Sequence, residues 1–156
     1  NVFNVTVAYF PITFRPPPND PFGITTESLV SGLNGVFNAT PMMAEHVIPM
    51  LLDKLRLTAS EVSLVKIDSL KTLASCIPHY GVFPMMPYLD ALRQAIFQHI
   101  VSPEEQAIAD ESLAVVQIMS KELARSSSSA DQIKSGPWNT FVERLLELCS
   151  HEVRKS

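Results

Sequence analysis

The sequence predicts an all-α fold, in which helices of ordinary length follow one another as a solenoid behind a proline-rich ordered arm. Apolar residues recur at helical spacing from Glu27 onward, and short breaks that contain Pro or Gly separate the helical segments. Similar segments also recur around Pro49 and Pro87, at a spacing near the roughly 40–47 residue period of helix-pair repeats. These observations favour a HEAT/armadillo-like α-solenoid of about three antiparallel helix pairs. A non-repeating helical bundle is the alternative.

Composition limits the classes of function. The chain has 156 residues, of which 46% are hydrophobic and 18% are charged, which is typical of a single unit with a buried core. The formal net charge of −4 argues against direct nucleic-acid binding, since neutralising phosphates requires clustered Lys and Arg. The two cysteines are too few for a disulfide framework and indicate a reducing compartment. No apolar run is long enough to span a membrane.

The first 24 residues divide into a short segment and an arm. Residues 1–8 fit either an alternating strand or the end of a preceding helix. Residues 9–24 contain five of the twelve prolines, and each proline removes a backbone donor, so no helix or central strand passes through them. The same residues include four aromatic rings. We therefore expect a stiff ordered arm whose rings rest on the helices that follow.

Residues 25–57 are predicted to form the first helix pair. Its first helix, Glu27–Phe37, follows threonines suited to capping. Thr40-Pro41 combines a capping hydroxyl with a proline at the first helical position, so it should start the second helix, Pro41–Leu55. Pro49 should bend that helix midway.

Residues 60–100 are predicted to form the second helix pair. Its helices are expected at Ser60–Ile77 and Pro84–Ile100. Pro78 should end the first of these helices together with Gly81, because proline cannot supply a helical hydrogen bond.

Residues 102–156 are predicted to form the third helix pair. Ser102-Pro103-Glu104-Glu105 combines a capping hydroxyl, a proline at the first helical position and a capping-box glutamate. It should therefore start a helix over Pro103–Arg125. A Ser-rich connection at 126–136 then leads to a last helix, Pro137–His151.

The arm carries a resemblance to a known family. The string Tyr-Phe-Pro-Ile-Thr-Phe-Arg-Pro-Pro-Pro-Asn-Asp-Pro-Phe-Gly-Ile stands at Tyr9–Ile24. It resembles the amino-terminal region of the HEAT-repeat adaptors of the cytosolic iron–sulfur assembly (CIA) targeting complex. That family was first named for sensitivity to methyl methanesulfonate and for roles in nucleotide excision repair and transcription. A weaker resemblance continues through Asp68–Leu73 and the helix around Tyr88.

The resemblance implies a non-enzymatic scaffold made of protein-binding helices. It would connect the iron–sulfur assembly targeting subunits with apoprotein clients such as DNA helicases, in the cytoplasm and the nucleus. The scaffold would hold no cofactor of its own. The resemblance also favours a helix end for residues 1–8. The chain begins at Asn1, without an initiating Met, and the apolar pattern of residues 1–8 is already under way there, so we expect the chain to be a fragment of a longer protein.

The arm is also the candidate site for a protein partner. A polyproline segment is a stiff ligand that loses little entropy on binding. The residues that would make this contact are Arg15, Pro16, Pro17, Pro18, Asn19 and Asp20. The alternative interpretation is architectural, with Phe10, Phe14 and Phe22 covering an exposed flank of the solenoid.

The sequence contains few signs of a catalytic or metal site. The sequence has no Gly-rich phosphate loop, no Gly-x-Ser-x-Gly elbow and no His-Glu-x-x-His. Cys76 with His79 and Cys149 with His151 together offer a tetrahedral set of metal ligands, but both cysteines lie on or beside apolar stripes. We expect no enzyme, no cofactor and no metal here.

Two Met-Met pairs, Met42–Met43 and Met85–Met86, are more typical of core packing than of a recognition groove. Two other function classes stay open. A karyopherin-like nuclear transport factor would also be an acidic helical solenoid, although we do not expect a proline-rich arm of this kind in that class of protein. A small Cys/His metal or redox protein would use the four ligands named above, and metal analysis of the purified protein would decide it.

Overall fold

The computed structural model describes residues 2–13, 15, 17, 21, 23–58, 62–126, 140, 143, 144 and 147. All regular elements among these residues are helical, which confirms the all-α prediction. In chain order they are α1 (Val2–Val7), α2 (Thr26–Phe37), the 3₁₀ helix η1 (Pro41–Met43), α3 (Ala44–Leu55), α4 (Ser63–Tyr80), α5 (Val82–Met85), the 3₁₀ helix η2 (Met86–Tyr88), α6 (Leu89–Val101) and α7 (Gln106–Ser126). None of these helices is both long and apolar enough to cross a bilayer.

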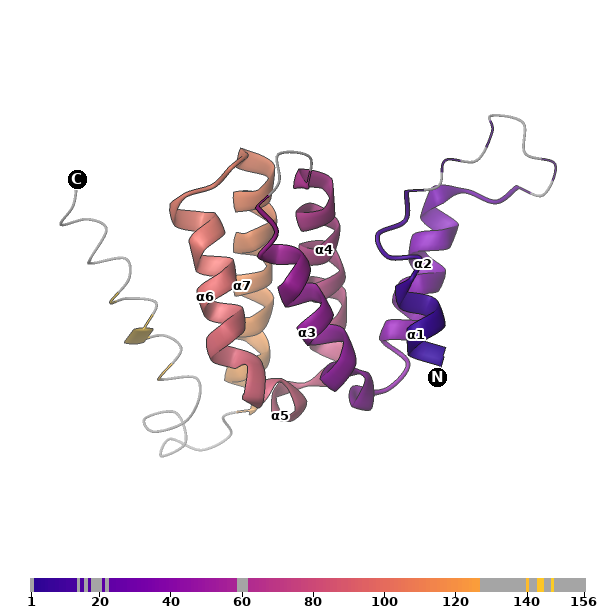
Figure 1. Ribbon diagram of the computed structural model, residues 1–156. Helices are drawn as coiled ribbons and strands as arrows, with labels where there is room; N and C mark the ends of the chain where they lie inside the picture. Colours follow the sequence, from indigo (N-terminus) through magenta and orange to yellow (C-terminus); the bar gives the residue numbers. More distant parts are fainter. Residues whose placement is uncertain are drawn as a thin grey trace.

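Four helices form the body of the molecule, an arrangement consistent with the predicted helical solenoid. We call this body the helical bundle (residues 41–126) as a name for the region only. α4 packs against α3 and α7, and α6 packs against α7 and α3. Figure 1 shows α3 and α6 in front and α4 and α7 behind them. α3 runs antiparallel to α4 and α6 runs antiparallel to α7, whereas α4 and α7 run in the same direction. The core between the helices contains Leu51, Leu70 and Leu73, each of which has no exposed surface. The grouping of the chain into repeats at 25–57, 60–100 and 102–156 stays a prediction.

α1, the described arm residues and α2 lie to one side of the bundle (Figure 1), and we call them the N-terminal unit (residues 2–37). Aromatic packing connects the two parts, because the ring centroid of Phe3 on α1 lies 5.2 Å from that of His46 on α3. The Phe37 side chain is completely buried, and its ring centroid lies 6.1 Å from that of Phe10 and 6.3 Å from that of Phe3. The Tyr80 hydroxyl on α4 donates a hydrogen bond of 2.8 Å to the Phe37 carbonyl. This carbonyl belongs to the last turn of α2, which has no intrahelical donor for it.

The helix starts follow local capping chemistry in the first half of the chain. The Thr25 side chain accepts a hydrogen bond from the Ser28 amide at the start of α2. The Thr40 side chain accepts one from the Met42 amide, and a 3₁₀ turn precedes α3. Pro49 lies inside α3.

α4 begins at Ser63 and not at Ser60, and three further boundaries differ from the expectation. α4 continues through Pro78 to Tyr80 and ends at Gly81, whose φ is +72°. Proline deletes a single donor, so a helix whose face is already buried can extend one more turn beyond it. The helix expected at Pro84–Ile100 is divided into α5, η2 and α6, because prolines at both 84 and 87 prevent a continuous hydrogen-bond ladder.

The third of these further differences concerns Ser102-Pro103-Glu104-Glu105. α7 begins at Gln106, not at Pro103, and Ser102 instead closes the C-terminal end of α6. The carbonyl of Glu105 accepts the first α7 hydrogen bonds, from the Ile108 and Ala109 amides. The segment 102–105 is thus a linker whose glutamates contact α4. The Ser-rich connection and most of the last expected helix lie outside the described residues, although Thr140, Glu143, Arg144 and Glu147 are helical.

Candidate partner-binding groove

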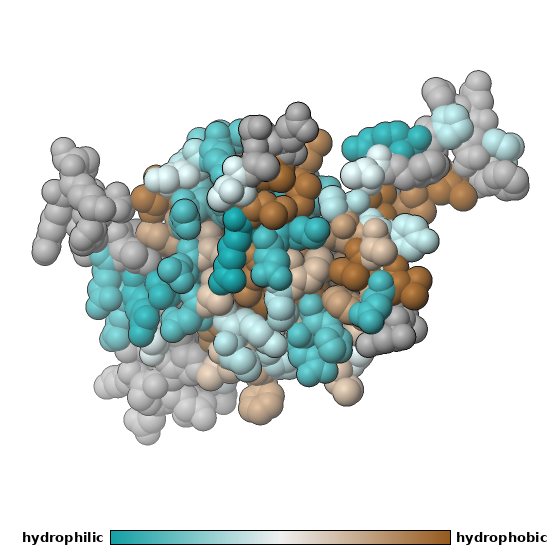
Figure 2. Space-filling model, viewed as in Figure 1, coloured by the Kyte–Doolittle hydropathy of each residue, from teal (hydrophilic) through white to brown (hydrophobic). Residues whose placement is uncertain are grey.

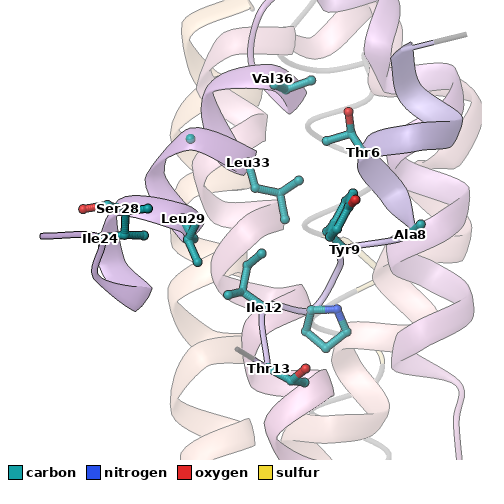
Figure 3. Close-up of a pocket in the computed structure, with 12 residues that line it drawn as sticks. Thr6, Ala8, Tyr9, Ile12, Thr13, Ile24, Ser28, Leu29, Leu33 and Val36 are labelled. Atoms are coloured by element: carbon teal, nitrogen blue, oxygen red, sulfur yellow. The ribbon is translucent and has the colours of Figure 1, made fainter. Parts of the chain in front are cut away.

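An apolar groove lies in the N-terminal unit, between α2 on one side and the end of α1 with the arm on the other (Figure 3). Its volume is about 690 Å³. This volume falls within the usual range for sites that bind a drug-sized molecule or a few side chains. The residues that line it are Thr6, Ala8, Tyr9, Pro11, Ile12, Thr13, Ile24, Ser28, Leu29, Gly32, Leu33 and Val36.

α2 supplies one wall because its apolar residues recur at helical spacing. Leu29, Leu33 and Val36 lie three or four residues apart and therefore share a face, and Figure 3 shows Leu29 and Leu33 directed toward the arm. Gly32 lies among them, and a Cβ atom added there would meet no atom within 4 Å. The missing side chain at Gly32 thus leaves space in this wall.

The arm supplies the other wall. Its side chains alternate, because Phe10 is 8% exposed and packs on Phe37 while the neighbouring Tyr9 is 68% exposed and lines the groove. The peptide bond between Phe10 and Pro11 is cis. Ile12 lies opposite Leu33 across the opening (Figure 3). The arm is therefore anchored by one ring and presents the next ring to solvent.

None of the described residues that line the groove carries a charge, and most of the lining surface is apolar. Figure 2 shows hydrophobic atoms gathered over α1 and α2, whereas the surface over α6 is mainly hydrophilic. Among the described lining residues there is no carboxylate, imidazole, thiol or ammonium group, and the Tyr9 phenol is the titratable side chain. It can bind apolar groups by excluding water from them.

Of the predicted partner-binding residues, the structure describes Arg15 and Pro17, and Arg15 contacts Ile12 in the groove lining. Arg15 and Pro17 are exposed, and the Arg15 guanidinium donates a hydrogen bond of 3.5 Å to the Ile12 carbonyl. Four of the predicted residues, Pro16, Pro18, Asn19 and Asp20, lie outside the described residues, as do Phe14 and Phe22. Partner binding by this stretch stays a prediction.

Sequence reasoning missed the groove itself. One signal was available, because the apolar stripe of α2 includes Leu29, Val30, Leu33, Val36 and Phe37, yet only Leu33 and Phe37 are buried. A stripe wider than the buried face leaves apolar surface for another contact. The sequence could not show that the arm folds back opposite this stripe.

The Cys and His residues are only partly described. The Cys76 side chain is completely buried, and burial raises the pKa of its thiol to about 11, so the thiol is protonated at neutral pH. The Nδ1 atom of His79 lies 2.9 Å from the Ser75 carbonyl oxygen. Cys149 and His151 lie outside the described residues. The part of the chain that the structure describes holds no group of three or more potential metal ligands.

The two Met-Met pairs each divide between core and surface. Met85 is completely buried and Met43 packs against the core, whereas Met42 is 75% exposed and Met86 is 43% exposed. The prediction of core packing is therefore correct for Met43 and Met85, but not for Met42 and Met86.

Comparison with known proteins connects this chain to one group. A family model described as "Dos2-interacting transcription regulator of RNA-Pol-II" matches residues 1–102. The MMS19 nucleotide excision repair protein homolog of Xenopus laevis is 37% identical over 152 residues, which cover 97% of this chain, and the Homo sapiens homolog is 36% identical over the same share. The Saccharomyces cerevisiae DNA repair/transcription protein that shares the MMS19 name is 44% identical over 81 residues, or 52% of this chain. The chain spans 14% of the length of the two vertebrate relatives, and the yeast match covers 8% of the yeast protein.

Proposed function

Because this chain belongs to the MMS19 family of DNA repair and transcription proteins, we propose that it forms part of a non-enzymatic scaffold that binds other proteins. In the full-length protein, the scaffold delivers the cytosolic iron–sulfur assembly machinery to apoprotein clients such as DNA helicases. It acts in the cytoplasm and the nucleus. The family assignment favours this adaptor over the karyopherin-like alternative.

The groove of the N-terminal unit is the observation that carries the proposal. Its uncharged lining and its volume of about 690 Å³ suit two or three apolar side chains of a protein segment. The exposed Tyr9 ring at its edge offers a large contact surface that loses little conformational entropy on binding. We assign the groove to an amphipathic segment of an assembly subunit or a client, inserted with its apolar side inward.

Arg15 and Pro17 extend this surface with different chemistry. Both are exposed, and Arg15 contacts Ile12 of the groove lining, so a partner segment that fills the groove would pass this part of the arm as well. The arm then contributes a stiff polar margin, and the groove contributes the apolar contact. A polar margin around an apolar centre is the usual organisation of a protein interface.

A matched pair of glycine variants tests the proposal. Gly32 and Gly35 both lie in α2, and a Cβ atom at either position meets no atom within 4 Å. Only Gly32 lines the groove. Replacing either glycine should favour the helix by up to about 1 kcal/mol, so Gly32→Phe and Gly35→Phe differ mainly in whether a ring enters the groove.

The measurement is affinity purification of full-length protein that carries each variant, followed by mass spectrometry. We expect iron–sulfur assembly proteins and clients to co-purify with the Gly35→Phe protein, and a subset of them to be lost from the Gly32→Phe protein. Replacing residues 15–18 by Gly-Ser should reduce the same subset. If the Gly32→Phe protein retains every partner, the groove is not the contact. If the unaltered protein retains no such partner, the scaffold proposal itself fails.

A further inference from the structure

A second cavity lies in the helical bundle and is polar, unlike the groove. Its volume is about 140 Å³, and it lies where the end of α3, the first turn of α4 and the end of α6 meet. Its lining includes two cations, Arg56 and Lys66, and one carboxylate, Glu104. Ser102 and His99 also line this cavity.

Lys66 is the buried cation of this cavity. It is 1% exposed, and its Nζ atom lies 2.6 Å from Oε1 of Glu104, whose side chain is 48% exposed. Beside this pair, the Ser63 hydroxyl donates a hydrogen bond of 2.6 Å to Oε1 of Glu105. Two contacts therefore join the segment 102–105 to α4. Because Glu104 faces water while Lys66 does not, Glu104 is the partner that a stronger anion could replace.

Arg56 supplies a second positive charge. Its side chain is exposed at the mouth of the cavity and makes no ion pair with any residue that the structure describes. Burial lowers the pKa of His99, which adds no charge at neutral pH. The described lining thus has one cation more than it has carboxylates, and an added anion would be attracted to it.

Ser102 lines the same cavity as these cations and lies in an accessible segment. Residues 102–105 are exposed and not helical, and the Ser102 hydroxyl has no hydrogen-bond partner among the described residues. Proline follows directly at 103, and glutamates follow at 104 and 105. A serine followed by proline, with an acidic residue three positions later, meets the substrate preferences of two common classes of protein kinase.

We propose that Ser102 is a phosphorylation site and that the cavity receives its phosphate, with Lys66 and Arg56 as the cations. In the reaction, Ser102 Oγ bonds to the γ-phosphorus of a nucleoside triphosphate. The bond from that phosphorus to the β,γ-bridging oxygen breaks, the nucleoside diphosphate leaves with the electron pair, and the hydroxyl proton is released. The phosphate brings a charge of about −1.5 to −2 at neutral pH.

The phosphate changes the partner of Lys66. At the C-terminal end of α6, a negative charge is unfavourable for the helix dipole, so its stabilisation comes from Lys66 and Arg56. Glu104 lies two residues away and is repelled, which releases it from Lys66. The modification thus exchanges one anion for another at a buried lysine and changes how the segment 102–105 is held on α4.

The first test treats the 156-residue chain with ATP and either a proline-directed kinase or a kinase that selects acidic residues after the serine. A peptide of residues 98–107 confirms that each kinase is active. Peptide mapping by mass spectrometry should place phosphate on Ser102 with at least one kinase, and Ser102→Ala should remove it. Thr40, which also precedes a proline, should remain unmodified because its hydroxyl caps η1. If both kinases modify the peptide and neither modifies the chain at Ser102, the proposal is wrong.

The second test asks where the phosphate lies. A phosphate between two cations should have a second pKa below its ordinary value of about 6, by roughly one unit, because the cations favour the dianion. ³¹P NMR titration of the phosphorylated chain should show this shift relative to the phosphopeptide. Arg56→Gln and Lys66→Met should each reduce it. A titration identical to that of the phosphopeptide would show that the cavity does not receive the phosphate.

Discussion

The N-terminal unit and the helical bundle use apolar residues in opposite ways. In the bundle, the residues at helical spacing are buried, as Leu51, Leu70 and Leu73 show. In the N-terminal unit, a few rings anchor the structure, and much of the remaining apolar surface, including Tyr9 at 68% exposed, stays open. The bundle thus supplies stability, and the N-terminal unit holds surface available for binding.

The two parts differ in how completely other segments cover the apolar faces of their helices. Each bundle helix has at least two neighbouring helices to cover it. Among the described residues, the groove face of α2 is opposed by the arm and the end of α1, which leave the groove open. Low contact density and exposed apolar surface are typical of segments that open locally.

Phe37→Ala should have the largest effect, because this ring joins the two parts. Truncating a fully buried Phe costs about 3–5 kcal/mol in the free energy of unfolding. Hydrogen exchange should show that α1 and α2 lose protection while α4 and α7 keep theirs. Equal loss of protection in all four helices would mean that the two regions are one cooperative unit.

Leu70→Ala tests the bundle itself. Leu70 lies on α4 with no exposed surface, so its truncation should cost about 2–5 kcal/mol by chemical denaturation. Leu113→Ala on α7 is the control, because Leu113 is 46% exposed and surface changes stay within about 0.5 kcal/mol. Similar losses for both variants would contradict the assignment of the buried faces. Leu145, a further expected core position, lies outside the described residues.

Tyr80→Phe removes the hydroxyl that binds the Phe37 carbonyl and keeps the ring. The carbonyl then stays buried without this donor, which should cost about 1–2 kcal/mol. The loss should appear as faster hydrogen exchange at the end of α2. If α2 exchanges as in the unaltered chain, the hydrogen bond does not help to hold the N-terminal unit.

His99 should make the bundle sensitive to acid. Burial lowers its pKa in the folded chain below the ordinary 6.5, against the opposing effect of its contact with the Leu55 carbonyl, with nearby Lys66 lowering and Glu104 raising that pKa. Below pH 6.5 the unfolded chain binds a proton at His99 that the folded chain does not bind. The contribution of neutral His99 to the free energy of unfolding is therefore fully present above pH 6.5 and is lost as the pH falls.

Denaturation curves at several pH values check this expectation. His99→Gln keeps an amide donor for the Leu55 carbonyl and does not titrate, so its stability should change less between pH 7.5 and the acid side of pH 6.5. A pH dependence identical to that of the unaltered chain would assign the acid sensitivity to other groups.

Local patterns were sufficient for much of the fold. Helical periodicity predicted helices over most of the residues in α2, α3, α4 and α7, and capping chemistry at Thr25 and Thr40 located two helix starts. The sequence of the arm pointed to the family that the comparisons support. These features depend on residues close together in the chain, so no knowledge of distant neighbours was needed.

Other features were decided by tertiary contacts. The glutamates of Ser102-Pro103-Glu104-Glu105 fit a capping box locally, but Lys66 and Ser63 from α4 bind them instead. The apolar stripe of α2 is a second example. The sequence is compatible with complete burial of this stripe, but in the structure the arm folds back opposite α2, and the stripe forms one wall of a groove.

The sequence by itself therefore determined the all-α class, two of the helix starts and the family, because propensity, capping and proline chemistry act over a few residues. The tertiary structure alone decided which apolar face stays open and which glutamate meets the buried lysine. Those outcomes depend on segments some forty residues apart, as between Lys66 and Glu104, and pairwise packing at that distance has no local signature in the chain.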